Sequence, residues 1–194
     1  VGVVTSGGTE SVLLAAKAAR DMARKKRPWI VRPNVVAPDS IHVAMDKACD
    51  YFGLKLIRVP VRGDYRADMK KLKKAVNLNT VLIAASAPQY VQGVIDPIEE
   101  IGAFAQQKGI PFHVDACIGG FVLPFMEQLG YDLPLFDFRV PGVTSISADI
   151  HKYGYAPKGS SLLLYRSMEY MRHQFFVCAK WTGGVYAGPN IPGS

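Results

Sequence analysis

The sequence predicts an α/β fold, in the form of a three-layer αβα domain with a mostly parallel β-sheet. Short runs rich in β-branched residues alternate with helical patterns of about ten or more residues, which is typical of βαβ units. The 194 residues are 49% apolar and 20% charged. This composition supplies the core of a single domain and excludes a disordered chain.

The first part of the chain alternates strands and helices in regular order. Apolar residues recur on one helical face at Val12, Ala15, Ala16 and Ala19, and Gly53 is a typical helix end. The predicted strands cover residues 1–5, 34–37, 54–61 and 80–86. The predicted helices cover residues 9–26, 40–52 and 68–77.

The second part continues this alternation. Asp96 and Pro97 open a helix that we expect to run to residue 108, because proline is favoured at the first helical position. The remaining predicted elements are strands over 112–115, 143–147 and 161–165 and a helix over 121–130. Residues 187–194 are expected to form a loop. Since the chain starts inside a strand and ends in this loop, we expect it to be a piece of a longer protein.

Much of the net charge of +7 lies in two basic runs, residues 24–27 and 70–74. One interpretation is a surface for nucleic acid or anionic lipid. The other is a pair of solvated helix ends, where cations interact favourably with the terminal carbonyl groups. No aromatic residues interleave the runs, so no stacking platform for single strands is indicated and no nucleic-acid partner is expected.

The three cysteines, Cys49, Cys117 and Cys178, are widely spaced and form no CxxC pair. This pattern argues against a disulfide framework or a zinc ribbon and favours a reducing compartment. No apolar run approaches the roughly 18 residues that a membrane-spanning helix needs. We expect a cytoplasmic protein, or one at the cytosolic face of a membrane if the full chain carries an anchor.

Ligands of open α/β sheets bind beyond the carboxyl ends of the strands, so the residues there are the candidates for function. After the first strand, Ser6, Gly7, Gly8 and Thr9 lead into a helix, and small residues let backbone N–H groups approach an anion such as phosphate. The alternative is an ordinary helix cap formed by Ser6 or Thr9. No lysine follows the glycines, so the Walker phosphate loop is excluded, and GxGxxG is absent as well.

Two further positions carry titratable side chains at predicted element ends. His42 lies near a helix start, where a capping or surface role is the alternative to a ligand contact. Asp115 ends an apolar strand, and a buried carboxylate needs a cation, a metal or a protonated nitrogen as its partner. His113 shares a strand face with Asp115, but no third ligand is in reach by sequence, so no metal site is expected.

Lys152 follows the predicted strand over 143–147. Because it lies at a strand end in a mostly apolar stretch, we expect a lowered pKa and a nucleophilic amine; the alternative is an ordinary surface lysine. An anion-binding turn, a flat histidine ring, a buried aspartate and an amine together match one cofactor. Pyridoxal 5′-phosphate (PLP) carries a phosphate, an aromatic ring, a protonatable ring nitrogen and an aldehyde.

Longer motifs around these positions carry a resemblance to a known family. They are VTSGGTES over residues 4–11, GVIDP over 93–97, HVDACIGGF over 113–121, GVTSISAD over 142–149 and HKYGYAPKG over 151–159. Over nearly its whole length the chain resembles the fold-type I PLP enzymes, within them the decarboxylase-like group, and most closely the sphingosine-1-phosphate lyases. SGGTE and HVDA are shared widely in that group, whereas the run over 153–159 is the most lyase-specific part.

The resemblance implies roles for four residues around the cofactor ring. Lys152 would be the Schiff-base lysine, and Asp115 would pair with the pyridinium nitrogen. His42 would stack on one face of the ring, and Cys117 would pack against the opposite face.

The resemblance also implies a set of phosphate-binding residues. Gly8, Thr9 and His151 would hold the cofactor phosphate, with Asp149 nearby. Lys158 would serve the substrate phosphate or a proton transfer.

The implied activity is that of a carbon–carbon lyase. It is the retro-aldol cleavage of a phosphorylated long-chain base, sphingosine or sphinganine 1-phosphate, to a fatty aldehyde and phosphoethanolamine. The resemblance further implies a homodimer in which residues 1–194 form the PLP-binding large domain. An N-terminal segment, a C-terminal small domain and any membrane contact would belong to parts outside this sequence. The alternatives are a PLP-dependent amino-acid decarboxylase and a non-catalytic α/β scaffold or interaction module.

Overall fold

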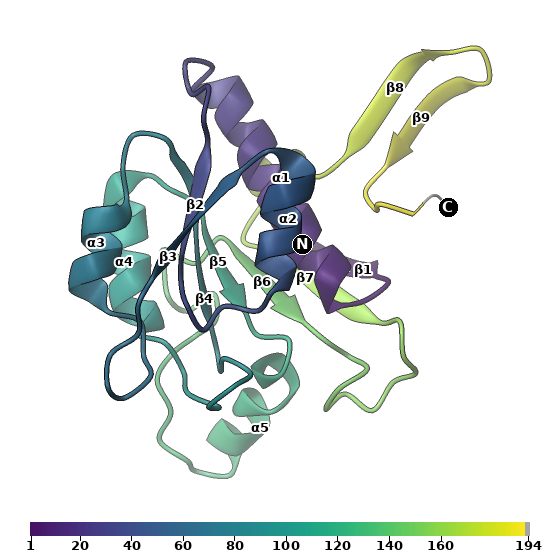
Figure 1. Ribbon diagram of the computed structural model, residues 1–194. Helices are drawn as coiled ribbons and strands as arrows, with labels where there is room; N and C mark the ends of the chain where they lie inside the picture. The colour runs from purple at the N-terminus through teal and green to yellow at the C-terminus, as the bar shows by residue number, and fades with distance from the viewer. Residues whose placement is uncertain (193–194) are drawn as a thin grey trace.

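The computed structural model describes residues 1–192 and folds them around a seven-stranded sheet (Figure 1). Its strands are β1 (Gly2–Thr5), β2 (Asn34–Pro38), β3 (Lys55–Val59), β4 (Thr80–Ser86), β5 (Phe112–Asp115), β6 (Ser145–Ala148) and β7 (Ser161–Tyr165). Their order across the sheet is β1-β7-β6-β5-β4-β2-β3. The strands from β6 to β3 run parallel, while β7 is antiparallel to both of its neighbours. The predicted mostly parallel sheet is therefore confirmed.

Helices cover both faces of the sheet, which gives the three predicted layers (Figure 1). α1 (Gly8–Lys26) and α2 (Ala44–Phe52) lie on one face, where their apolar side chains pack with those of β2 and β4. α3 (Met69–Ala75) and α4 (Ile98–Lys108) lie on the other face, over an apolar cluster that includes side chains of β4 and β5. Within residues 1–192, no helix has both the length and the apolar character to cross a bilayer.

The starts of α1 and α2 differ from the prediction, and both lie beyond the carboxyl ends of the strands that precede them, β1 and β2. α1 begins at Gly8, one residue before the predicted start. α2 begins at Ala44 instead of residue 40, because a turn closed by the bond from Ile41 N to Pro38 O precedes it. The side chain of His42 lies in this connection, and its Nδ1 accepts the N–H of Ala44 at 3.1 Å.

The two basic runs occupy different positions in their helices. The run over 24–27 lies at the end of α1, as one of the two interpretations predicts. The run over 70–74 spans most of α3, which is shorter than the predicted helix over 68–77. Lys70 and Lys71 therefore lie in the first turn, where the Asp68 carboxylate accepts both of their backbone N–H groups.

Several other boundaries differ from the prediction. β3 ends at Val59, and Val61 instead forms an isolated antiparallel bridge with Ala67. The predicted helix over 121–130 is a 3₁₀ turn, η1 (Gly119–Phe121), followed by the short α5 (Leu123–Gln128). β6 lies two residues later at its start than the predicted strand over 143–147.

Three elements near the C-terminus were not predicted. They are α6 (Met168–Met171), β8 (Phe176–Trp181) and β9 (Gly184–Gly188). β8 and β9 form an antiparallel hairpin that projects away from the seven-stranded sheet (Figure 1). The predicted loop over 187–194 overlaps the end of β9, and Gly193 and Ser194 lie outside the described residues.

Asp96, predicted to open a helix, is instead a buried structural carboxylate. Its Oδ1 accepts the N–H of Ala67 and its Oδ2 accepts the N–H of Ser86, each at 2.9 Å. α4 begins only at Ile98, with Pro97 as its N-cap. Because Ser86 is the last residue of β4, Asp96 fixes the carboxyl end of that strand.

We expect Asp96→Asn to lower the free energy of unfolding of the complete protein by about 1–3 kcal/mol, the cost of an unsatisfied buried donor. An asparagine has one acceptor oxygen, so its NH₂ group would face one of the two backbone N–H donors. Asp68→Asn is the control, because asparagine caps helices as well as aspartate does. Chemical unfolding curves check both variants, and equal stability of the two would contradict this role of Asp96.

Candidate functional site

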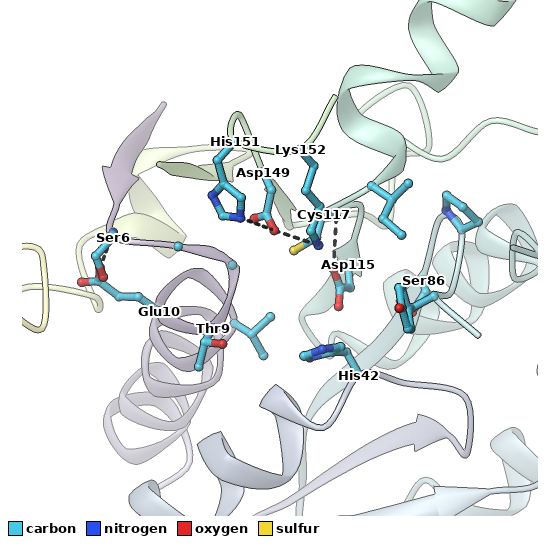
Figure 2. A pocket seen from close by; sticks show the side chains of 16 residues that line it. Ser6, Thr9, Glu10, His42, Ser86, Asp115, Cys117, Asp149, His151 and Lys152 are labelled. Carbon is cyan, nitrogen blue, oxygen red and sulfur yellow. Dashed lines mark hydrogen bonds and ion pairs between the residues drawn. The ribbon is translucent and has the colours of Figure 1, made fainter. Parts of the chain in front are cut away.

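The carboxyl ends of the parallel strands open into a cavity of about 460 Å³, within the usual size range of ligand pockets. The turn between β1 and α1, the start of α2, the ends of β4 and β5 and the segment after β6 contribute to its wall (Figure 2). The lining residues are Ser6, Gly7, Gly8, Thr9, Glu10, Val12, His42, Ser86, Pro88, Tyr90, Asp115, Cys117, Ile118, Asp149, His151 and Lys152. The fold thus brings together every predicted site residue except Lys158.

The start of α1 forms one wall of the cavity. Its N-cap is Gly7, with φ of 149°, and no side chain caps the helix, so the alternative of a cap by Ser6 or Thr9 is wrong. The N–H groups of an uncapped first turn attract an anion. The space beside them depends on Gly8, since a Cβ there would lie 2.7 Å from both carboxylate oxygens of Asp149.

Glu10 holds the turn that precedes α1. Its Oε2 accepts the N–H of Ser6 at 2.6 Å and the hydroxyl of Ser6 at 2.7 Å. Its Oε1 accepts the N–H of Ile191 at 2.8 Å. The Glu10 carboxylate is therefore occupied by backbone and hydroxyl donors, and it ties the turn to the segment after β9.

Asp115, the last residue of β5, is 8% exposed. Its Oδ1 accepts the N–H of Cys117 at 3.1 Å and the hydroxyl of Ser147 at 3.3 Å. Among residues 1–192 the carboxylate forms no ion pair, and its Oδ2 has no hydrogen-bond partner. Because burial of a carboxylate without a cation is unfavourable, Asp115 offers a strong site for a protonated nitrogen in the cavity.

Lys152 contacts a second buried carboxylate, that of Asp149 (Figure 2). The Lys152 Nζ lies 2.9 Å from Asp149 Oδ2, and the lysine side chain is 37% exposed. Burial lowers the pKa of the amine, but the hydrogen bond to Asp149 and the charges of Asp149 and Asp115 outweigh it, so the pKa is raised. The predicted lowering is wrong, because the sequence does not show that Asp149 touches the amine.

Two histidines lie on different sides of the cavity. The Nδ1 of His151 donates a hydrogen bond to the carbonyl oxygen of Ser160 at 2.7 Å, and its Nε2 lies 3.7 Å from Asp149 Oδ2. His42 lies across the cavity from Lys152 (Figure 2). His42 accepts a backbone N–H at the start of α2 and also lines the cavity, but the N-cap of α2 is Val43, so the predicted alternative of a capping histidine is not what the structure shows.

Lys158 is exposed and does not line the cavity. Six lining residues were not among the predicted site residues: Glu10, Val12, Ser86, Pro88, Tyr90 and Ile118. Ser86 ends a predicted strand, so its position was a usable signal, whereas the loop residues gave none. In residues 1–192 no group of three or more His, Cys, Asp or Glu side chains is arranged to hold a metal ion.

The chemistry of these groups fits PLP. The uncapped start of α1 beside Gly8 suits a phosphate, the Lys152 amine can react with an aldehyde, and the free oxygen of Asp115 can bind a protonated ring nitrogen. The orphaned Oδ1 of Asp149, buried and without a partner in residues 1–192, adds an unused acceptor to the same cavity.

Comparison with known proteins agrees with this site. The family model described as "Pyridoxal-dependent decarboxylase conserved domain" matches residues 1–186. The chain is 56% identical over 194 residues to "Sphingosine-1-phosphate lyase 1" of Rattus norvegicus, covering 100% of this chain and 34% of the relative. It is 55% identical over 193 residues to "Sphingosine-1-phosphate lyase" of Arabidopsis thaliana, covering 100% of this chain and 35% of the relative.

Solved structures show the same fold. The sphingosine-1-phosphate lyase of Burkholderia pseudomallei matches with a TM-score of 0.96 and 47% identity, over 100% of this chain and 44% of that chain. The glutamate decarboxylase of Lactobacillus brevis matches with a TM-score of 0.81 and 27% identity, over 99% of this chain and 46% of that chain. These matches confirm the predicted fold class and the resemblance on which it partly rests.

The chain spans about a third of the length of the curated relatives. Within that span the similarity is continuous, and it includes the segments that carry the cavity. The family model covers all of the cavity residues, from Ser6 to Lys152, and the cofactor it names fits the groups gathered there. The chain therefore belongs to the pyridoxal-dependent decarboxylase family.

Proposed function

We propose that the complete protein is a PLP-dependent lyase that cleaves a phosphorylated long-chain base, such as sphingosine or sphinganine 1-phosphate, to a fatty aldehyde and phosphoethanolamine. The observation that carries this proposal is the 50–56% identity of the whole chain to sphingosine-1-phosphate lyases of animals, plants, yeast and Dictyostelium. The cavity supports it, because it holds an amine, an unpaired carboxylate and an anion-binding helix start.

When bound, PLP supplies an aldehyde that captures amines and a ring that accepts electrons from a breaking bond. In our proposal, Lys152 would be the amine that holds the cofactor, and Asp149 Oδ2, 2.9 Å from Nζ, would orient that amine in the cavity. Asp115 keeps the ring nitrogen protonated, which strengthens the ring as an electron acceptor. His42, on the other side of the cavity from Lys152, would stack on one face of the ring, and Cys117, beside Asp115, would pack against the opposite face.

The phosphate-binding groups form the remaining part of the proposal. The first turn of α1, with Gly8 and Thr9, binds the phosphate through backbone N–H groups. His151 lies on the same side, since a Cβ on Gly7 would come within 4.0 Å of its ring. Lys158, exposed outside this cavity, is the candidate for contact with the substrate phosphate or for proton transfer.

A second candidate is decarboxylation of an amino acid with the same cofactor. The family model and the structural match to a glutamate decarboxylase favour it. The two reactions share the cofactor site and differ in the bond that breaks. They are therefore distinguished by their products.

The test incubates the complete protein with PLP and sphinganine 1-phosphate and measures fatty aldehyde and phosphoethanolamine by mass spectrometry. A parallel set of amino acids, glutamate included, is assayed for carbon dioxide. We expect both cleavage products in equal amounts and no carbon dioxide above the level of a Lys152→Ala control. Carbon dioxide release without aldehyde would establish the decarboxylase instead.

Lys152→Ala should abolish covalent attachment of the cofactor. Borohydride reduction followed by peptide mapping is expected to find the label on Lys152 in the wild type and on no lysine in the variant. Lys152→Arg should behave like the alanine variant, because a guanidinium stays protonated and forms no imine. Lys158→Ala is the control and should keep the label; a label that disappears in this control but survives in Lys152→Ala would reverse the assignment.

Gly8→Ala should weaken PLP binding to the complete apoprotein by about tenfold or more, since overpacking costs about 1–3 kcal/mol. The added Cβ would lie 2.7 Å from both carboxylate oxygens of Asp149, beside the uncapped first turn of α1. Thr9→Ser is the control, because it retains the hydroxyl group. Titration followed by absorbance gives both dissociation constants, and unchanged affinity in Gly8→Ala would place the phosphate elsewhere.

We also propose that the complete protein is a homodimer whose interface includes the hairpin of β8 and β9. Phe176, Val177, Trp181 and Val185 are 58–75% exposed there, and such apolar patches mark interfaces. Phe175, the residue before β8, is partly buried against an apolar cluster formed by side chains of α1, β7 and α6 and is therefore not part of this exposed surface.

Light scattering at low micromolar concentration tests this assembly. We expect a dimer for the wild type and a shift toward monomer in Trp181→Glu combined with Val185→Glu. Leu78→Glu is the control, because Leu78 is an exposed apolar residue outside the hairpin. A fully active wild-type monomer would refute the proposed assembly.

A further inference from the structure

A row of polar side chains lies buried along β5 and β6 and ends at Asp115. His113 and Asp115 are two residues apart on β5, and their register partners on β6 are Ser145 and Ser147. Since strand side chains alternate, all four share one face of the sheet. Phe112 and Val114 point to the other face, into the cluster under α3 and α4, so the polar row faces α1.

Hydrogen bonds connect the row from end to end. The Nδ1 of His113 lies 2.9 Å from Ser145 Oγ, and its Nε2 lies 3.2 Å from Ser147 Oγ. Ser147 Oγ in turn donates to Asp115 Oδ1 at 3.3 Å, and the thiol of Cys117 donates to Ser147 Oγ at 3.5 Å. The side chain of His113 is fully buried, and its two ring nitrogens are bonded to Ser145 and Ser147.

The number of protons that these side chains carry determines which group donates and which accepts in each of these hydrogen bonds. Burial lowers the pKa of His113 to about 4, against the opposing effect of Asp115, so the imidazole is neutral at pH 7 and carries one proton. Burial also raises the pKa of the Cys117 thiol, which therefore keeps its proton. Ser147 has one proton and two lone pairs to share among His113, Cys117 and Asp115.

Only one assignment of donors and acceptors gives each of these side chains a hydrogen-bond partner. If His113 is protonated on Nε2, it donates to Ser147, Cys117 donates to Ser147, and Ser147 donates to Asp115. Ser145 then donates to the bare Nδ1. In the opposite tautomer, protonated on Nδ1, Ser147 donates its proton to the bare Nε2 of His113. Asp115 Oδ1 then loses a hydrogen-bond donor, which is unfavourable for a buried carboxylate.

We propose that His113, a neutral imidazole protonated on Nε2, is a positioning residue for the cofactor: it directs the Ser147 hydroxyl toward Asp115 and so holds that carboxylate in its orientation. Both described donors then engage Oδ1, Ser147 and the N–H of Cys117. Oδ2 is left for the protonated ring nitrogen. His113 touches neither cofactor nor substrate and acts only through Ser147. This inference rests on the proposed role of Asp115 but not on which reaction the protein catalyses.

Two variants of His113 with the same amide chemistry distinguish this role from a merely structural one. In His113→Gln the amide nitrogen reaches the position of Nε2 and can still donate to Ser147. In His113→Asn the shorter side chain reaches only the position of Nδ1, beside Ser145. Ser147→Ala removes the connecting hydroxyl, and Ser161→Ala is the control. Ser161 is an equally buried serine that bonds Ser11 and the carbonyl oxygen of Ala148 instead of Asp115.

The readouts are the ¹⁵N chemical shift of ring-labelled PLP in the complete holoprotein and the dissociation constant of PLP from the apoprotein. We expect a pyridinium shift and unchanged affinity in the wild type, His113→Gln and Ser161→Ala. In His113→Asn and Ser147→Ala the shift should move toward that of a neutral pyridine, and affinity should fall about tenfold, as for loss of one hydrogen bond to a charged group. The double variant His113→Asn with Ser147→Ala should change the ¹⁵N shift and the PLP affinity no more than Ser147→Ala alone does, because both substitutions interrupt the same series of hydrogen bonds.

A measurement on the unmodified protein keeps the proposal falsifiable if a His113 variant does not fold. The ¹⁵N spectrum of the wild-type histidines should show His113 as the neutral Nε2–H tautomer. A neutral Nδ1–H tautomer overturns the proposal. So do pyridinium shifts and PLP affinities that are the same in His113→Asn, Ser147→Ala and the Ser161→Ala control. Failure of Asp115→Asn to alter the pyridinium shift would instead refute the proposed role of Asp115 itself.

Discussion

Asp115 is a carboxylate at the end of a central strand, almost fully buried, with two hydrogen-bond donors on one oxygen and no cation in contact among residues 1–192. A charge in this position is stable only if the remaining oxygen meets a positive partner. The strand order places the end of β5 beside the end of β6, and Asp115 and Lys152 line the same cavity. The constraint on which the cavity depends is therefore that the unbonded oxygen of Asp115 requires a positively charged hydrogen-bond partner.

The second buried carboxylate of the cavity, Asp149, differs from Asp115 because it contacts a cation of the protein itself. It contacts the Lys152 ammonium and lies close to the His151 ring, and its side chain fills the space that a Cβ on Gly8 would need. The raised pKa of Lys152 shows that this carboxylate favours the protonated amine. Two aspartates at adjacent strand ends thus differ in their partners: Asp149 contacts the lysine of the protein, and Asp115 keeps one oxygen without a partner in residues 1–192, which our proposal assigns to the ring nitrogen of the cofactor.

The sequence predicted the sheet and which candidate residues would gather at one cavity, Lys158 excepted, because both depend on local patterns. Apolar strands followed by Asp115, by Lys152 and by the Ser6–Gly7–Gly8 turn place these groups at one edge of any parallel sheet. The pKa of Lys152 was predicted in the wrong direction, because its cause is a contact within the folded loop. The Asp96 carboxylate shows the same limit, since its partners, Ala67 and Ser86, lie far from it in sequence. The hairpin of β8 and β9 was missed, because its exposed strands are half apolar and half small or polar without a clear alternation.

The most direct test of the central claim about Asp115 is a binding cycle on the complete apoprotein. It compares PLP with an analogue whose ring nitrogen is replaced by C–H, in the wild type and in Asp115→Ala, by measuring four dissociation constants. If Asp115 binds the protonated ring nitrogen, the wild type binds PLP about tenfold or more tightly than the analogue, as expected for a hydrogen bond between charged groups. Asp115→Ala then shows little or no preference. An equal preference for PLP in both proteins would contradict the claim, because the ring nitrogen would then be recognised by some other group.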